Sequence, residues 1–178
     1  MPKEENAIIL DYLPHGYPLE DDMKPIAQAI GEDYFTLLQL VPRRGKSLEP
    51  GEKVYIGEGK REKIHFIKGR LPREKLTESA KIKLEDFVEE KIDEDEEKFV
   101  KFFNEAEAVN ARVHQFTLLP GMGKKHTEEL LDEREGKPFE SFKDIKERIP
   151  TLPDPKKTVK KRIIKELTTM QRHNLFIQ

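Results

Sequence analysis

The segment Leu118-Leu-Pro-Gly-Met-Gly-Lys-Lys-His-Thr-Glu-Glu-Leu-Leu131 joins an apolar helix end to a glycine-rich turn and then to a second helix. We predict that this second helix begins at Gly123 or Lys124. Gly121 and Gly123 can both adopt positive φ angles, and neither has a side chain to keep a phosphate from the backbone N–H groups. The unpaired N–H groups and the dipole of the following helix favour an anion at the same place. The segment therefore predicts a phosphate site, with Lys124 and Lys125 at its rim and Met122 filling the gap between the helices.

This segment resembles the helix-hairpin-helix family of sequence-independent nucleic-acid-binding modules. The family pattern, Leu-Pro-Gly-(Ile/Val)-Gly-x-x-x-Ala-x-x-(Ile/Leu), is matched at Leu119, Pro120, Gly121, Gly123 and Leu130. Met122 stands at the apolar hairpin position, and Thr127 stands where Ala is usual. In that family the hairpin backbone grips the phosphodiester, so the resemblance implies this role for Gly121, Met122, Gly123, Lys124 and Lys125, with His126 close enough to touch phosphate. The alternative is a turn that only packs two helices or contacts a protein.

A second, altered copy of the turn lies 33 residues further along the chain. Leu119-Pro120 recurs as Leu152-Pro153, and Leu130-Leu131 recurs as Ile163-Ile164. The residues between the copies, 134–149, resemble the connection inside a tandem helix-hairpin-helix unit. The resemblance therefore implies a tandem with two hairpins.

The second hairpin is degenerate, because Asp154-Pro155-Lys156 stands where the first copy has Gly121-Met122-Gly123. Both glycines and one N–H group are lost. We expect Asp154 to cap the last helix, with Pro155 at the first helical position, where a missing N–H costs nothing. The side chains that we expect to replace the lost amides as phosphate contacts are Lys156, Lys157, Lys160 and Lys161.

The N-terminal third is predicted to consist of short strands separated by turn residues. Strand-like runs occupy residues 7–13, 34–41, 53–56 and 63–68, while residues 21–31 are predicted to hold one or two helical turns. Four short strands with glycine turns favour a small barrel or a strongly curled sheet. The segment resembles an OB-fold or a truncated OB-like barrel, in which residues 49–57 look like a strand entry.

An OB-like barrel implies a nucleic-acid face made of exposed groups on its second and third strands and the adjoining loops. Aromatic rings on such a face stack bases, at about 1 to 3 kcal/mol each. The candidates are Tyr34, Tyr55, Arg43, Arg44, Lys46, Lys60 and Arg61. The alternative is that the tyrosines cover the core and the arginines contribute only solubility.

Two amphipathic helices are predicted between the barrel and the glycine-rich turn, from apolar stripes within residues 76–88 and 99–109. We expect Asp93 to cap the second helix in a capping box with Glu96. The acidic run 93–97 lacks the ligand spacing of a calcium loop and is expected to be solvated. The predicted protein is α+β and multidomain: an OB-like β-barrel at 1–72, a helical linker at 73–109, and an all-α tandem helix-hairpin-helix domain at 110–178.

Composition narrows the class of protein. The 178 residues include no cysteine, which excludes disulfide frameworks, thiol catalysis and Cys-based metal sites. No early apolar run suits a signal peptide or a membrane span, so we expect a cytoplasmic protein with no membrane partner. Abundant Lys and Glu are typical of thermophile proteins. Residues 111–178 hold 15 basic against 10 acidic side chains, an asymmetry that favours a polyanionic partner.

Enzyme motifs are missing from the sequence. The five histidines show no metal-ligand spacing, and the chain has no P-loop, dinucleotide fingerprint or nucleophile elbow. We therefore expect no cofactor and no catalysis. A metal-dependent nuclease that uses Asp or Glu is the enzymatic alternative.

With an OB-like barrel, a helical linker and a tandem helix-hairpin-helix domain in this order, the chain resembles an uncharacterised archaeal family. That family is classed as a domain of unknown function, and RNA binding is inferred for it. The expected function is non-enzymatic nucleic-acid binding without base specificity, with RNA favoured over DNA. The alternative is a scaffold that contacts ribosomal or repair proteins in a ribonucleoprotein or DNA-repair assembly. Salt separates the two, because phosphate contacts release counterions and an apolar protein interface does not.

Overall fold

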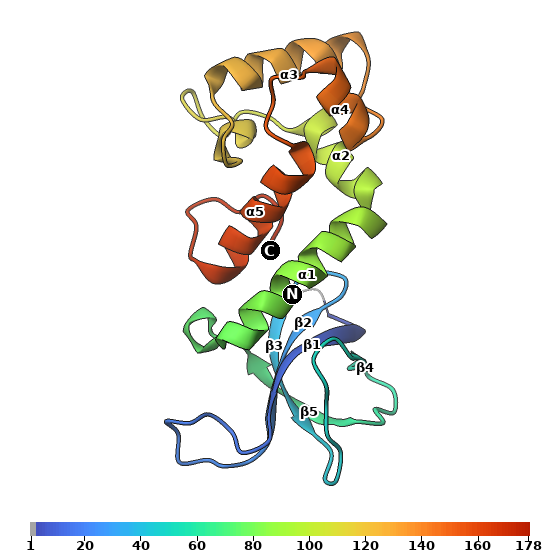
Figure 1. Ribbon diagram of the computed structural model, residues 1–178, viewed down its shortest axis with the longest axis vertical. Helices are drawn as coiled ribbons and strands as arrows, with labels where there is room; N and C mark the ends of the chain where they lie inside the picture. The colour runs from blue at the N-terminus through green and yellow to red at the C-terminus, as the bar shows by residue number, and fades with distance from the viewer. Residues whose placement is uncertain (1–2) are drawn as a thin grey trace. The chain divides into compact units, whose positions relative to one another are not determined.

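All strands of the described chain, residues 3–178 of this computed structural model, lie within residues 6–70. They are β1 (Asn6–Leu13), β2 (Ile26–Gly31), β3 (Leu37–Pro42), β4 (Lys53–Tyr55) and β5 (Ile64–Arg70). Neighbouring strands are antiparallel and follow the order β4-β1-β2-β3-β5. Figure 1 shows how they curl into an open half-barrel.

Strand β2 is the element that the sequence pattern missed, so the helical turns predicted for residues 21–31 are wrong. All six residues of β2 are buried. A strand covered on both faces lacks the polar and apolar alternation that reveals a half-buried strand. The predicted run 34–41 also begins too early, because β3 starts at Leu37 and residues 32–36 form the turn that connects it to β2.

The two faces of β2 meet different partners. Ala27 and Ala29 belong to the apolar cluster inside the half-barrel, together with Ile9, Leu40 and Ile64. The other face is covered by the beginning of helix α1 (Glu78–Glu94), where Ala80, Leu84 and Phe87 are buried. Phe87 meets Phe35 edge to face, with ring centroids 5.9 Å apart. Burial on both sides therefore positions the first turns of α1 on the sheet.

Polar contacts fix where α1 begins. Gln28, buried in the middle of β2, donates from Nε2 to the carbonyl oxygen of Lys75 at 2.6 Å and accepts from the N–H of Thr77 at 3.1 Å. Thr77 Oγ1 donates to Asp11 Oδ2 at 2.5 Å and accepts from the N–H of Ala80 at 3.0 Å, which caps the helix. A polar residue thus sits in a buried strand because both its amide groups have partners.

We expect the substitution Gln28→Leu to lower the free energy of unfolding by about 2 kcal/mol, since it leaves the part-buried carbonyl of Lys75 and N–H of Thr77 without their partner. His65→Leu, at an exposed position of β5, is the control and is expected to change stability by less than about 0.5 kcal/mol. Urea denaturation of both variants measures the difference. Equal stability would show that the amide contacts do not hold the start of α1.

The helices that follow are α2 (Glu96–Glu105), the 3-10 helix η2 (Gln115–Leu118), α3 (Lys124–Gly136), α4 (Phe142–Arg148) and α5 (Pro155–Thr168).

The chain forms two compact units. One runs up to Phe87 and includes Leu167–Gln178, and the other is Val88–Glu166. An aromatic cluster fills the core of the second unit, where Phe103 stacks on Phe116 at 5.7 Å and meets Phe142 edge to face at 6.3 Å.

The predicted capping role of Asp93 is wrong. Helix α1 continues through Asp93 to Glu94, and the N-cap of α2 is Asp95, whose side chain makes no capping hydrogen bond. The stripe predicted for α2 is confirmed at Phe99 and Phe103, which are buried, but the helix ends at Glu105. No helix within residues 3–178 is both long and apolar enough to cross a membrane.

Candidate nucleic-acid interface

The first turn, residues 120–123, has the open backbone that the sequence predicts, although its two glycines differ. Gly121 has a φ angle of 80°, which favours glycine. Gly123 is extended, with φ −112° and ψ −170°, so of the two glycines that can adopt a positive φ only Gly121 does so. Both glycines are exposed, and a Cβ placed on Gly123 would meet nothing within 4 Å. Gly123 is therefore required by neither backbone geometry nor packing.

Helix α3 begins at Lys124 with Gly123 as its N-cap, as predicted. The N–H of Thr127 donates to the carbonyl oxygen of Gly123 at 3.1 Å. The N–H groups of Lys124, Lys125 and His126 precede this bond and have no acceptor within the helix. The first turn of α3 holds no acidic residue, and the glycine N-cap offers no side-chain acceptor. The end of the helix thus presents free donors and the positive end of its dipole.

Three predicted site residues flank this helix end. Lys124 and Lys125 are exposed, and neither forms an ion pair within residues 3–178. His126 is half-buried. Met122 is buried between the elements, with Leu119 and Leu130, as predicted. The element before the turn is η2, a single 3-10 turn rather than the apolar α-helix end that we expected.

In the second turn, residues 153–156, the side chain of Asp154 caps the following helix. Asp154 Oδ1 accepts from the N–H of Lys157 at 3.2 Å, and Pro155 is the first residue of α5. The predicted cap is confirmed. This carboxylate takes up a helix donor that α3 leaves open.

The two turns contact each other. Thr158 Oγ1, in the first turn of α5, donates to the carbonyl oxygen of Pro120 at 2.5 Å. A Cβ on Gly121 would approach Pro153 Cγ to 3.2 Å, which leaves little room for a side chain. The beginning of α5 therefore supports the backbone of the first turn.

Arg162, one of the 15 basic side chains of residues 111–178, has a structural role that was not predicted from the sequence. Its side chain is 4% exposed and donates from Nε to Glu166 Oε2, one turn later and fully buried, at 2.7 Å. Its Nη1 also donates to the carbonyl oxygen of Leu118, at the end of η2, at 3.2 Å. The spacing of four residues between Arg162 and Glu166 was the available signal.

The four lysines that we expected to act together fall into two pairs. Lys156 forms ion pairs with Asp93 at 2.6 Å and Glu89 at 3.7 Å, and Lys160 pairs with Glu89 at 3.4 Å. The hydrogen bond to Asp93 raises the pKa of Lys156. The expectation that all four lysines are available to phosphate is therefore wrong for this pair. Their partners share the same spacing of four residues, on α1.

The other pair is open to solvent. Lys157 and Lys161 are exposed, and no ion pair to either is found in the described part of the chain. They lie on the α5 helix beside Thr158, which contacts the first turn. The basic groups free to meet a polyanion near the turns are thus Lys124, Lys125, Lys157 and Lys161.

The candidates on the half-barrel lie on loops and strand ends. Tyr34 is exposed on the turn between β2 and β3, and Arg44, Lys46 and Lys60 are exposed on the loops before and after β4. Three others are held by backbone groups. The Tyr55 hydroxyl accepts from the N–H of Gly59 at 2.9 Å, Arg43 Nε donates to the carbonyl of Arg61 at 2.7 Å, and Arg61 Nε donates to the carbonyl of Gly57 at 2.8 Å.

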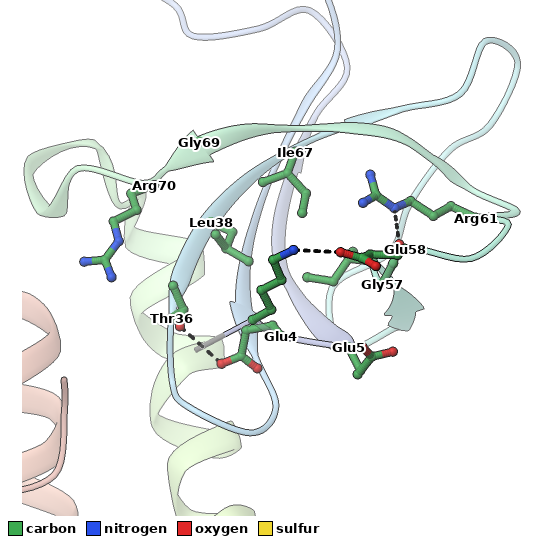
Figure 2. Close-up of a pocket in the computed structure, with 12 residues that line it drawn as sticks. Glu4, Glu5, Thr36, Leu38, Gly57, Glu58, Arg61, Ile67, Gly69 and Arg70 are labelled. Atoms are coloured by element: carbon green, nitrogen blue, oxygen red, sulfur yellow. Dashed lines mark hydrogen bonds and ion pairs between the residues drawn. The ribbon is translucent and has the colours of Figure 1, made fainter. Parts of the chain in front are cut away.

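A hollow of about 640 Å³ in the half-barrel was not foreseen from the sequence (Figure 2). Apart from Arg61, none of the predicted site residues lines it. Its lining comes from the chain before β1, from β3, from the loop after β4 and from β5, namely Lys3, Glu4, Glu5, Thr36, Leu38, Ile56, Gly57, Glu58, Arg61, Ile67, Gly69 and Arg70. Separately, no group of three or more His, Asp or Glu side chains able to hold a metal ion occurs among residues 3–178.

A curled half-barrel of five antiparallel strands followed by helices makes this an α+β protein. Residues 3–178 match the family described as "Protein of unknown function (DUF655)", and the chain belongs to that family. It is 42% identical over 174 residues to "Uncharacterized protein MJ0038" of Methanocaldococcus jannaschii, covering 98% of this chain and 79% of that protein. The crystal structure of Af1531 from Archaeoglobus fulgidus is similar, at 40% identity and a TM-score of 0.85, over 98% of this chain and 100% of that one. The expected membership of an uncharacterised archaeal family is confirmed.

Proposed function

We propose that this protein is a non-enzymatic nucleic-acid-binding protein, with RNA favoured over DNA, that grips the phosphate backbone without base specificity. In this proposal residues 119–131 act as a helix-hairpin-helix, the second turn is its degenerate tandem copy, and the half-barrel is OB-like. One observation carries the proposal: the start of α3 presents free N–H groups behind two exposed glycines, with Lys124 and Lys125 unpaired beside them. A phosphate fits such a site because hydrogen-bond donors, helix dipole and cationic side chains coincide there.

The difference between the two turns supports the same function. Asp154 supplies an internal anion to the N-terminus of α5, whereas the N-terminus of α3 has no such group. A turn needed only for packing gains stability from an N-cap side chain, so its absence at Gly123 favours a role in binding. The second turn then contributes through Lys157 and Lys161.

RNA is favoured by the exposed rings of the half-barrel. Tyr34 and Tyr55 are exposed, and unpaired bases stack on such rings. Single-stranded RNA displays unstacked bases, whereas duplex DNA hides their faces.

Fluorescence anisotropy over a salt series tests the proposal. Purified protein is titrated into matched single-stranded RNA, duplex RNA and duplex DNA, each with a fluorescent end label. We expect binding whose affinity falls steeply as salt rises, because counterions are released from the phosphates. Failure to bind any of the three at low salt would overturn the proposal.

The two lysine pairs of α5 provide a matched comparison. We expect Lys157→Gln with Lys161→Gln to reduce the salt slope of RNA binding by about one to two units, as expected when two phosphate contacts are lost. Lys156→Gln with Lys160→Gln removes the same charge from the same helix but is expected to leave the slope unchanged, because those lysines are held by Glu89 and Asp93. A larger reduction of the salt slope by Lys156→Gln with Lys160→Gln than by Lys157→Gln with Lys161→Gln would show that the ion pairs with α1 open to admit nucleic acid.

A protein scaffold is the second candidate, and one observation favours it. Leu19 and Met23, on the loop between β1 and β2, are 99% and 71% exposed. Exposed apolar side chains of this size suit a protein contact. The affinity of a protein partner bound there would depend little on salt, whereas the affinity of a phosphate contact would fall steeply as salt rises.

A further inference from the structure

The hollow lies at the seam where the half-barrel stays open. Within the described residues β4 pairs only with β1, and β5 pairs only with β3, so no strand joins β4 to β5. Gly57, just after β4, and Gly69, on β5, line the hollow from the two sides of this seam. Strand edges that have no neighbour present unpaired backbone N–H and C=O groups. On the β4 side, the N–H of Ile56 already donates to the carbonyl oxygen of Glu5 at 2.8 Å, and the carbonyl of Gly57 accepts from Arg61 Nε. The backbone groups that the seam offers to a ligand are therefore those on the outer edge of β5.

The floor of the hollow is apolar. Leu38 and Ile56 are buried members of the half-barrel core, and Ile67 is a half-buried residue packed against that core. Figure 2 shows Leu38 and Ile67 on neighbouring strands, close to one another at the back of the hollow. At about 640 Å³ the space is within the range of small-ligand sites, roughly 300 to 1,000 Å³.

Arg61 is held at one side of this floor. Its Nε donates to the carbonyl oxygen of Gly57 at 2.8 Å, which fixes the guanidinium plane. In Figure 2 the terminal nitrogens are directed toward Ile67, and they form no hydrogen bond or ion pair within residues 3–178. A guanidinium plane stacks on flat aromatic rings and also offers further N–H donors.

The charges around the opening balance and leave no surplus of positive charge for a phosphate, because Lys3, Arg61 and Arg70 line the hollow together with Glu4, Glu5 and Glu58. Lys3 is already paired with Glu58 at 2.7 Å, and this contact raises the pKa of Lys3 and lowers that of Glu58. Glu5 adds a further exposed carboxylate. A ligand that enters the hollow is therefore recognised through a flat, uncharged part. Gly69 adds access to the strand edge, since a Cβ there would meet nothing within 4 Å.

We propose that the hollow binds one unpaired nucleobase, stacked on the Arg61 guanidinium above Leu38, Ile56 and Ile67, with its polar edge on the backbone of the seam. The source is an unpaired base of the RNA strand whose phosphates the first turn grips, so this part rests on the proposed function. Phosphate contacts give no base specificity, and a base site supplies a preference for unpaired RNA.

Two probes test the inference on the full-length protein. Adenosine monophosphate is titrated while the NMR signals of the Ile56 and Ile67 methyl groups are followed. A single-stranded RNA containing one 2-aminopurine is titrated separately, and its fluorescence reports stacking. We expect both probes to give saturable changes.

Three variants locate the site. Ile67→Trp fills the hollow, and Arg61→Gln removes the stacking plane, so each is expected to weaken binding of both probes about tenfold, as for one lost base-stacking contact. Phe66→Trp is the control, because Phe66 is adjacent to Ile67 on β5 but does not line the hollow. If Ile67→Trp fails to fold, the affinity of Arg61→Gln for the two probes decides whether the hollow binds a base.

The outcomes separate this inference from the proposed function. Duplex RNA reports the phosphate grip and should bind all three variants like the wild type. Methyl shifts with adenosine monophosphate but no quenching in RNA would overturn the RNA strand as the source and leave a free nucleotide. No response to either probe in the wild type, or wild-type affinity of both Ile67→Trp and Arg61→Gln for the probes, would overturn the base site even where duplex RNA binds.

Discussion

The substitution Gly123→Asp is expected to weaken RNA binding by roughly 30- to 150-fold while the protein stays folded. The aspartate would stand at the N-cap of α3 and accept from the free N–H groups of the helix. The first turn would then carry the internal anion that Asp154 gives to the second. Loss of a hydrogen bond to a charged phosphate costs about 2 to 3 kcal/mol, which corresponds to the stated loss of affinity.

The substitution Gly123→Asp should raise the stability of the protein while it lowers the affinity for RNA. Gly123 has an extended backbone that any residue adopts, and open space surrounds its Cβ position. Replacing glycine by aspartate at an N-cap is expected to stabilise the helix by a few tenths of a kcal/mol. Gly121 is unsuitable for this test, because its φ of 80° and the nearby Pro153 ring would strain any side chain.

Gly123→Asn is the matched control for Gly123→Asp. Asparagine has the same shape and caps helices equally well but carries no charge, so its effect on RNA affinity should be clearly smaller. Anisotropy at several salt concentrations gives the affinities, and thermal unfolding gives the stabilities. Unchanged RNA binding by Gly123→Asp would show that the α3 N-terminus does not hold phosphate.

Local signals in the sequence predicted the two helix starts correctly. A glycine-rich turn before Lys124 and the Asp154-Pro155 pair at the start of α5 act within a few residues of the chain, so no tertiary information is needed to predict these starts. The same holds for strands β1 and β5, which lie at or near their predicted positions.

Features that depend on distant residues were not predicted. Burial of β2 on both faces removed the alternation that marks a strand, and its polar Gln28 is explained only by the contacts with Lys75 and Thr77. Lysines 156 and 160 looked identical to their neighbours, because the carboxylates that hold them lie more than 60 residues earlier in the chain. A hollow between two strand edges has no local sequence signal at all.

The second large effect is expected from Arg162→Met, which should lower the free energy of unfolding by about 3 to 5 kcal/mol. Glu166 is fully buried, and the substitution removes the cation that is paired with its carboxylate. It also removes the donor to the carbonyl oxygen of Leu118. Chemical denaturation measures the loss as a lower midpoint.

The double variant Arg162→Met with Glu166→Leu should recover most of that stability, because an apolar pair of similar volume replaces a buried ion pair at little or no cost. RNA affinity then distinguishes two roles for Arg162. A side chain that is 4% exposed has no surface for phosphate, so the folded double variant should bind RNA within about threefold of the wild type. If the double variant is as stable as the wild type but binds RNA more than tenfold more weakly, then the hold of Arg162 on Leu118 is needed to shape the first turn. Arg162 would then be a residue that positions the phosphate site, and the conclusion that it only stabilises the fold would be wrong.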